Sequence, residues 1–232
     1  MADVNPIYCA LDMADKEQAD RFAADLKHVI GGLKIGMTYF YANGVEGYQS
    51  IAQHGLPIFL DLKLHDIPNT VACAVRALCP LKPAILNIHV GGGRAMMQEA
   101  AKAAAEFGEQ APLLIGVTVL TSLEKNDLDD IGIVHNATEQ TLKLANLAQK
   151  SGLDGIVCAA HEITQLRREC GADFKLIVPG IRPEGHPTHD QKRIMTPKSA
   201  YEAGADILVI GRPITDAANP VDAARQITQS LL

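Results

Sequence analysis

The sequence predicts an α/β fold, a single-domain (β/α)8 TIM barrel that spans residues 1–232. Short apolar runs rich in β-favouring residues alternate with longer amphipathic segments, and the alternation repeats eight times. A chain of 232 residues also has an ordinary length for one such barrel. Strand and helix in regular succession imply a parallel sheet, and eight such units in a chain of this length fit a closed barrel better than an open sheet.

The first unit shows the pattern most clearly. Residues 7–12 read IYCALD and predict a strand, and residues 14–30 place their apolar side chains on one helical stripe. Further strands are expected at residues 33–40, 57–64, 84–90, 112–120, 155–160, 175–181 and 206–211, with an amphipathic stretch at 220–232. The first turn reads LDMADK and lacks the G-x-G-x-x-G pattern of an open nucleotide-binding sheet, which also favours the barrel.

Composition narrows the classes of function. The chain is 47% hydrophobic and 21% charged, which is a globular balance. Its formal net charge of −6 argues against nucleic acid as a partner, because such binding normally needs a basic face. No apolar run approaches the roughly 20 residues of a membrane span, and the N-terminus lacks a basic region followed by an apolar one. We therefore expect no membrane association and a cytoplasmic location.

The third expected strand, in the stretch FLDLKLHDIPNT at residues 59–70, carries charges where a buried strand would be apolar. Asp61 and Lys63 are two positions apart and so share one face of a strand. The leucines at positions 60, 62 and 64 share the other face and can pack under the helices. The charged face is therefore predicted to point into the barrel.

Other strands aim ionisable groups at the same end of the barrel. Asp12 ends the first expected strand, Lys34 lies on the second, and His89 lies near the end of the fourth. A single Asp-x-Lys pair would be explained best as a structural ion pair. Because well-packed apolar residues often stabilise a core as well as buried ion pairs do, a whole cluster of charges favours a functional site.

The chemistry of this cluster follows from its lysines. An opposite charge about 4 Å away is worth roughly 4 kcal/mol at an effective dielectric of 20, so Lys34 and Lys63 are expected to stay protonated. A Schiff-base lysine must be neutral, and an aldolase of the imine type is therefore disfavoured. A fixed ammonium suits the stabilisation of a carbanion and the donation of a proton to it.

A phosphate site is expected at the loops after the seventh and eighth strands, where barrels commonly bind phosphate. These loops read VPGIRPEGHPTHDQKRI at residues 178–194 and VIGRPI at 209–214. Gly211 permits close approach of the backbone, and Arg212 offers a bidentate donor. Arg182 and Gln191 lie on or beside the long polar loop. Taken singly, each arginine could equally be a solvated residue after a strand.

Taken together, the motifs resemble a known family. DLKLHDIPNTV at residues 61–71 is similar to the signature of bacterial orotidine 5′-monophosphate decarboxylases. ALD, LKIG, GVTVLTS, PGIR, DQ and IGRPI follow in that family's order, so that the resemblance covers essentially the whole chain. The D-x-K-x-x-D core alone also resembles the related 3-keto-gulonate-phosphate decarboxylases and hexulose-phosphate synthases.

The resemblance implies roles for particular residues. The catalytic tetrad would be Lys34, Asp61, Lys63 and Asp66. Asp66 would reach the site across the interface of a homodimer, together with Ile67 and Thr70.

The other implied contacts bind the nucleotide. Asp12 and Lys34 would hold ribose hydroxyls, Thr121 and Gln191 would contact the pyrimidine and a closed loop, and Arg182, Gly211 and Arg212 would hold the 5′-phosphate. The family's reaction converts orotidine 5′-monophosphate into uridine 5′-monophosphate (UMP) and uses no metal or organic cofactor. We expect Lys63 to stabilise and protonate a C6 carbanion, with remote phosphate binding closing the loop over the site.

The sequence leaves two alternatives open. The first is a sugar-phosphate decarboxylase or synthase on the same barrel, in which the carboxylates of the 61–71 motif would bind Mg²⁺. The second is a non-catalytic phosphosugar-binding protein, because neither a fold nor a phosphate site proves turnover. The buried charge cluster argues against the second, since binding alone does not require it.

Overall fold

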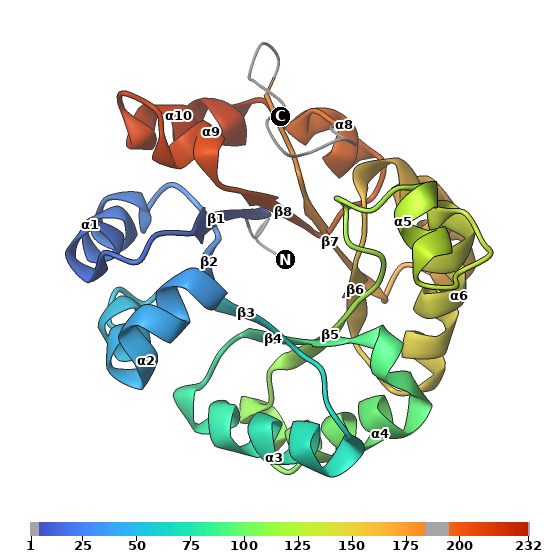
Figure 1. Ribbon diagram of the computed structural model, residues 1–232. Coiled ribbons are helices and arrows are strands. Elements are labelled where there is room, and N and C mark those ends of the chain that lie inside the picture. The colour runs from blue at the N-terminus through green and yellow to red at the C-terminus, as the bar shows by residue number, and fades with distance from the viewer. Residues whose placement is uncertain (1–4, 184–194, 232) are drawn as a thin grey trace.

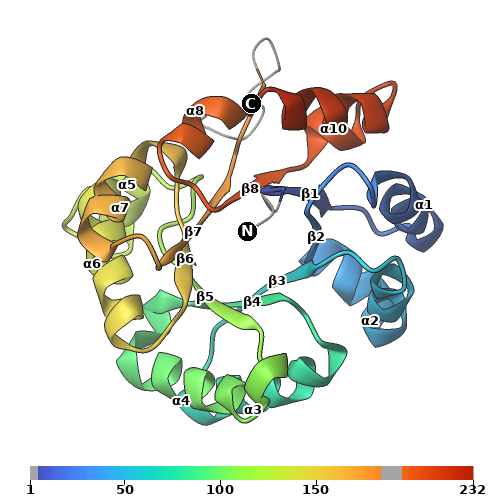
Figure 2. The same cartoon turned by 180° about the vertical axis from the view of Figure 1, so that it is seen from behind.

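The computed structural model describes residues 5–183 and 195–231. Within these residues, eight parallel strands form a closed barrel in the order in which they occur along the chain. The helices surround the ring of strands, as both views down the barrel show (Figures 1 and 2). The predicted fold class, a (β/α)8 barrel, is confirmed.

The strands of the barrel are short. Their bounds are β1 (Ile7–Leu11), β2 (Gly32–Gly36), β3 (Ile58–Leu64), β4 (Ile85–His89), β5 (Leu113–Val117), β6 (Gly155–Val157), β7 (Lys175–Pro179) and β8 (Ile207–Ile210). Pairing of β1 with both β2 and β8 closes the ring.

The helices form the outer layer. They are α1 (Lys16–Leu26), α2 (Met37–Ala52), α3 (Pro68–Leu78), α4 (Gly93–Ala105), α5 (Lys125–Asp130), α6 (Ala137–Lys150), α7 (Ile163–Cys170), α8 (Pro197–Glu202), α9 (Arg212–Thr215) and α10 (Pro220–Gln229). Short 3₁₀ turns are η1 (Cys79–Leu81), η2 (Val90–Gly92), η3 (Gly108–Gln110) and η4 (Ala160–Glu162).

The second strand is shorter than its apolar run predicted. The expectation of a strand over residues 33–40 is wrong beyond Gly36, where α2 begins at Met37. Tyr39, Tyr48 and Ile51 are buried along one side of α2, so packing on the barrel outweighs the β preference of residues 37–40. The first helix is likewise shorter than residues 14–30. It begins at Lys16, after Asp15 caps it by accepting a hydrogen bond from the Gln18 amide, and it ends at Leu26.

Alternation along the strands separates two apolar layers. Outward-facing residues such as Leu33, Ile35 and Leu60 belong to the large core between strands and helices. The interior of the barrel holds a smaller cluster made of Tyr8, Ala10, Phe59, Ile85, Ile115, Ile177 and Val209. Lys34 and Asp61 continue the inward-facing series of β2 and β3 and therefore lie at the top of this inner cluster.

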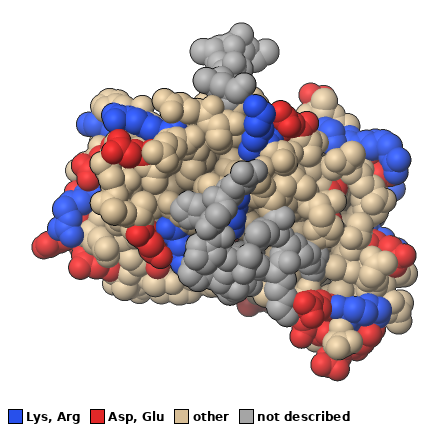
Figure 3. Space-filling view, turned by 90° about the horizontal axis from the view of Figure 1, so that it is seen from above, with Lys and Arg blue, Asp and Glu red and all other residues tan. Residues whose placement is uncertain are grey.

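The surface and the helices can be compared with the expectations that the protein binds neither nucleic acid nor membranes. On the face shown in Figure 3, acidic and basic side chains are mixed around the rim, with uncharged residues between them. That face has no continuous basic stripe among the residues the structure describes. No helix in the described part of the chain is long and apolar enough to cross a membrane. The cytoplasmic location stays a prediction.

Candidate active site

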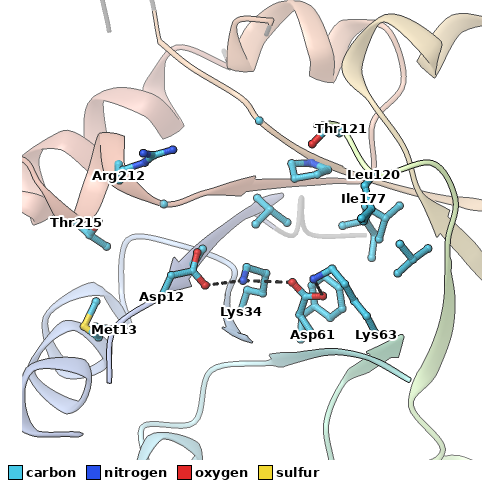
Figure 4. Close-up of a pocket in the computed structure, with 18 of the residues that line it drawn as sticks. Asp12, Met13, Lys34, Asp61, Lys63, Leu120, Thr121, Ile177, Arg212 and Thr215 are labelled. Carbon is cyan, nitrogen blue, oxygen red and sulfur yellow. Dashed lines mark hydrogen bonds and ion pairs between the residues drawn. The ribbon is translucent and has the colours of Figure 1, made fainter. Parts of the chain in front are cut away.

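A cavity of about 670 Å³ opens at the end of the barrel where the strands finish. This is the end at which (β/α)8 enzymes carry their active sites, and the volume suits a small-molecule ligand. Figure 4 shows its central charged residues. The cavity is lined by Asp12, Lys34, Asp61, Lys63, Thr121, Arg182, Gly211 and Arg212, together with apolar residues from most of the strands.

Lys34 lies between two carboxylates. Its Nζ atom is 2.8 Å from Oδ1 of Asp12 and 3.3 Å from Oδ2 of Asp61 (Figure 4). Burial alone would lower the pKa of Lys34, but the negative charges of Asp61 and Asp12 outweigh it and the pKa is raised. Lys34 is therefore a permanent cation at the floor of the site.

Asp61 is the centre of the charged cluster. Its Oδ1 accepts hydrogen bonds from Nζ of Lys63 at 2.6 Å and from Nδ2 of Asn87 at 2.7 Å. Burial would raise the pKa of this carboxyl, yet the charges of Lys34 and Lys63 and the bond from Asn87 lower it below its ordinary value. Asp61 is thus ionised at neutral pH although it is buried.

Lys63 has an unusual backbone. Its φ of 53° lies in the left-handed region, which costs a residue other than glycine on the order of 1–2 kcal/mol. The backbone N–H of Lys63 donates to Oδ1 of Asn87 at 2.8 Å. This local conformation occurs where the pairing of β3 with β4 shifts register between Leu60 and Leu64.

Gly36 gives the cation and its carboxylates room to meet. A Cβ atom at this position would lie 3.0 Å from Oδ1 of Asp12 and 3.1 Å from Nζ of Lys34. Either contact is tighter than most real Cβ contacts, so a larger residue would push the Asp12 and Lys34 side chains apart. Nothing in the sequence pattern alone had indicated a role for Gly36.

Apolar side chains form much of the cavity wall. Ala10, Phe59, Val157, Ile177 and Val209 line it and belong to, or pack on, the cluster inside the barrel. An aromatic ring placed there would be held by apolar contact on the side away from water. Exclusion of water strengthens the electrostatic interactions of the adjacent charges.

The expected phosphate residues lie on the cavity wall. Arg182 follows β7 and is buried, and Gly211 and Arg212 follow β8. Thr121, after β5, also lines the cavity. The structure therefore brings together these four predicted residues around the charged cluster. The fifth, Gln191, lies outside the described residues.

Asp66, Ile67 and Thr70 do not line this cavity. All three side chains are exposed, with Ile67 67% exposed, on the segment that follows β3. Oδ1 of Asp66 accepts a hydrogen bond from the Ile67 amide at 2.7 Å. Within one chain, the described structure thus assembles three members of the predicted tetrad and leaves Asp66 apart from them.

Sequence reasoning missed Asn87. This residue lies on β4, is fully buried and contacts both Asp61 and Lys63. The signal was a polar residue at an inward position of the apolar run AILNIHV. His89, two positions later, packs near His65 with ring centroids 5.2 Å apart, and burial lowers its pKa, as do the nearby His65 and Lys63.

Comparison with known proteins decides the family. The model of the orotidine 5′-phosphate decarboxylase / HUMPS family matches residues 5–227. The chain belongs to this family. The resemblance found in the sequence is thereby confirmed, and with it the expectation of a decarboxylase.

Individual members of the family match over nearly their full lengths. The chain is 49% identical over 227 residues to orotidine 5′-phosphate decarboxylase of Novosphingobium aromaticivorans, covering 98% of this chain and 99% of the relative. It is 50% identical over 226 residues to the enzyme of Psychromonas ingrahamii, covering 97% of each. The crystal structure of the Lactobacillus acidophilus enzyme superposes with a TM-score of 0.86 at 35% identity, covering 98% of this chain and 99% of that one.

Proposed function

We propose that this protein decarboxylates orotidine 5′-monophosphate to UMP, the last step of de novo pyrimidine synthesis. The observation that carries the proposal is a buried carboxylate, Asp61, held between the ammonium groups of Lys34 and Lys63 beside an apolar wall. Family membership and the names of the similar proteins support the choice of substrate.

The substrate is oriented by its two ends. The 5′-phosphate is held by Arg182, Gly211 and Arg212, and the ribose hydroxyls meet Asp12 and Lys34. The pyrimidine then extends along the apolar wall, with C6 and its carboxylate towards Asp61 and Lys63. Thr121, which lines the cavity, contacts the ring. The expected loop closure and the contact from Gln191 fall on residues 184–194 and remain predictions outside the described residues.

The reaction breaks one carbon–carbon bond. The substrate carboxylate lies against Asp61, and like-charge repulsion disfavours this ground state until CO₂ departs. The bonding electron pair stays on C6, where the Lys63 ammonium stabilises it electrostatically. Lys63 then donates a proton to C6, which gives UMP, and regains a proton from solvent.

Binding of the 5′-phosphate contributes to catalysis although it occurs far from C6. Interactions with Arg182 and Arg212 hold the nucleotide in place, so that the carboxylate is forced towards Asp61 and not away from it. Binding energy used in this way lowers the barrier of the chemical step instead of only tightening the complex.

We further propose that the active protein is a homodimer in which Asp66, Ile67 and Thr70 act in the partner's site. Their position supports this: they follow the catalytic strand β3, yet they are exposed and do not line the cavity of their own chain. The exposed Ile67 side chain would be covered by such an interface.

No metal or organic cofactor is needed for these steps. Both oxygens of Asp61 already face ammonium groups, Oδ1 with Lys63 and Oδ2 with Lys34. A divalent cation at this carboxylate would meet two positive charges at close range, which disfavours the Mg²⁺-dependent sugar-phosphate alternative.

The test is a product assay. Protein treated with EDTA and then dialysed is mixed with orotidine 5′-monophosphate, and UMP and CO₂ are quantified. We expect both products in equal amounts, with no change on adding Mg²⁺. Absence of UMP from folded protein, or turnover of a 3-keto sugar phosphate that requires Mg²⁺, would contradict the proposal.

A further inference from the structure

The register shift between β3 and β4 places Asn87 opposite the catalytic residues. Leu60 pairs with Leu86 and Leu64 pairs with Ile88, so three residues of β3 stand against the single Asn87 of β4. The regular pairing of the two strands is interrupted over these residues. The two charged residues of the strand, Asp61 and Lys63, lie within this bulge.

The Asn87 side chain bridges the interruption. Its Nδ2 donates to the carboxylate of Asp61 and its Oδ1 accepts from the backbone N–H of Lys63. Since a carboxylate can only accept and an N–H can only donate, reversing the amide would break both bonds. The orientation of this amide is therefore fixed by its partners, and its side chain is fully buried.

The two hydrogen bonds of Asn87 hold two different catalytic residues. One fixes the carboxylate that faces the substrate, and the other holds the left-handed backbone from which the Lys63 side chain extends. The ends of these side chains meet at 2.6 Å. A change at Asn87 would therefore shift both the carboxylate that destabilises the substrate and the ammonium that protonates the C6 carbanion.

We propose that Asn87 is a positioning residue, which sets the Lys63 ammonium and the Asp61 carboxylate relative to C6 without touching the substrate itself. This inference rests on the proposed function. Displacement of catalytic groups by about 1 Å can lower a rate roughly 100-fold, so kcat should be the sensitive quantity. Phosphate and ribose contacts come from other strands, so affinity for UMP should change little.

The first variant is Asn87→Leu, which keeps a similar volume and removes both hydrogen bonds. We expect kcat to fall about 100-fold or more, while the Kd for UMP measured by calorimetry stays within about threefold. The matched control is Thr141→Val, which removes a buried hydrogen bond to Glu162 outside the cavity. It should lower thermal stability and leave kcat unchanged.

The second variant, Asn87→Asp, gives a readout that a purely structural role would not move. When protonated, the new carboxyl can donate to Asp61 and accept from Lys63, as the amide does; when ionised, it cannot donate. The ionisable groups that contact it are Asp61 and Lys63 on β3. Around these, Lys34 on β2 pairs with Asp61, and His89, two positions further along β4, lies beside His65. Because the two carboxyls titrate as a coupled pair, kcat of the variant relative to wild type should rise as the pH falls.

The outcomes separate the two proposals. If wild type produces UMP while Asn87→Leu keeps near-native kcat, or while the Asn87→Asp ratio is flat with pH, the positioning role is wrong. If wild type produces no UMP, the proposed function itself fails. Should Asn87→Leu not fold, the pH dependence of Asn87→Asp decides alone.

Discussion

Nζ of Lys63 lies 2.6 Å from Oδ1 of Asp61, on the same strand and beside the apolar wall of the cavity. Lys63 is the proposed proton donor, and Asp61 carries the carboxylate proposed to repel the carboxylate of the substrate. Breaking a buried pair by removing one partner leaves an uncompensated charge, so variants at the two positions have distinct consequences.

Removal of the Asp61 charge should change how stability depends on pH. The folded-state pKa of Asp61 is below the ordinary 3.8, because the positive charges of Lys34 and Lys63 outweigh the effect of burial. The stability that its ionisation contributes is therefore fully present above pH 3.8 and is lost as the pH falls through the lower, folded-state pKa. The difference in Tm between wild type and Asp61→Asn should shift in favour of the variant below about pH 4.

The control for that experiment is Asp173→Asn, which changes an exposed carboxylate outside the cavity. Its Tm should follow that of wild type across the same range. A Tm difference between wild type and Asp61→Asn that stays constant from pH 6 to pH 2 would mean that Asp61 is not held ionised by the two lysines.

Replacement of Arg212 by Ala should weaken the interaction of the protein with the 5′-phosphate of the substrate. Loss of a hydrogen bond to a charged group costs about 1.5–3 kcal/mol, which lowers kcat/KM for orotidine 5′-monophosphate by roughly 10- to 100-fold. Activity on orotidine, which lacks the phosphate, should be unchanged by the same substitution. Arg225→Ala, on an exposed arginine of α10, is the control and should alter neither substrate's kcat/KM. Equal losses on both substrates would show that Arg212 does not bind phosphate.

Mixing two inactive variants tests the shared site. Lys63→Ala and Asp66→Ala should each be nearly inactive alone. In a mixed dimer, one site would pair an intact Lys63 with the partner's intact Asp66. After unfolding and refolding an equal mixture, activity should return to about a quarter of wild type, since half of the dimers hold one working site of two. No recovery, with mixed dimers present by mass spectrometry, would place Asp66 in its own chain's site or outside both.

Much of the fold and part of the site follow from sequence pattern. Alternation along β3 predicted correctly that Asp61 faces into the barrel, because strand parity is a local property. The end of β2 was not predictable in this way, since Met37 to Phe40 favour a strand locally and become helical only through packing of α2 on the barrel.

The remaining features of the site depend on relations between strands. Asn87 gains its role from the register shift that sets it against Asp61 and Lys63, and no spacing within one strand reveals that shift. The left-handed backbone of Lys63 is likewise invisible in a sequence, because such conformations are expected chiefly at glycine. The role of Asp66 depends on a second chain and stays a prediction.

The most direct test of the account is the rate at which Lys63→Ala consumes orotidine 5′-monophosphate, followed by loss of the near-ultraviolet absorbance of the orotate ring. EDTA-treated wild type and Lys102→Ala, a control at an exposed helical lysine, are measured in parallel. We predict rapid loss of the chromophore with both of these and no measurable loss with Lys63→Ala, which should still bind UMP. Near-native kcat in Lys63→Ala would contradict the assignment of Lys63 as the group that stabilises and protonates C6.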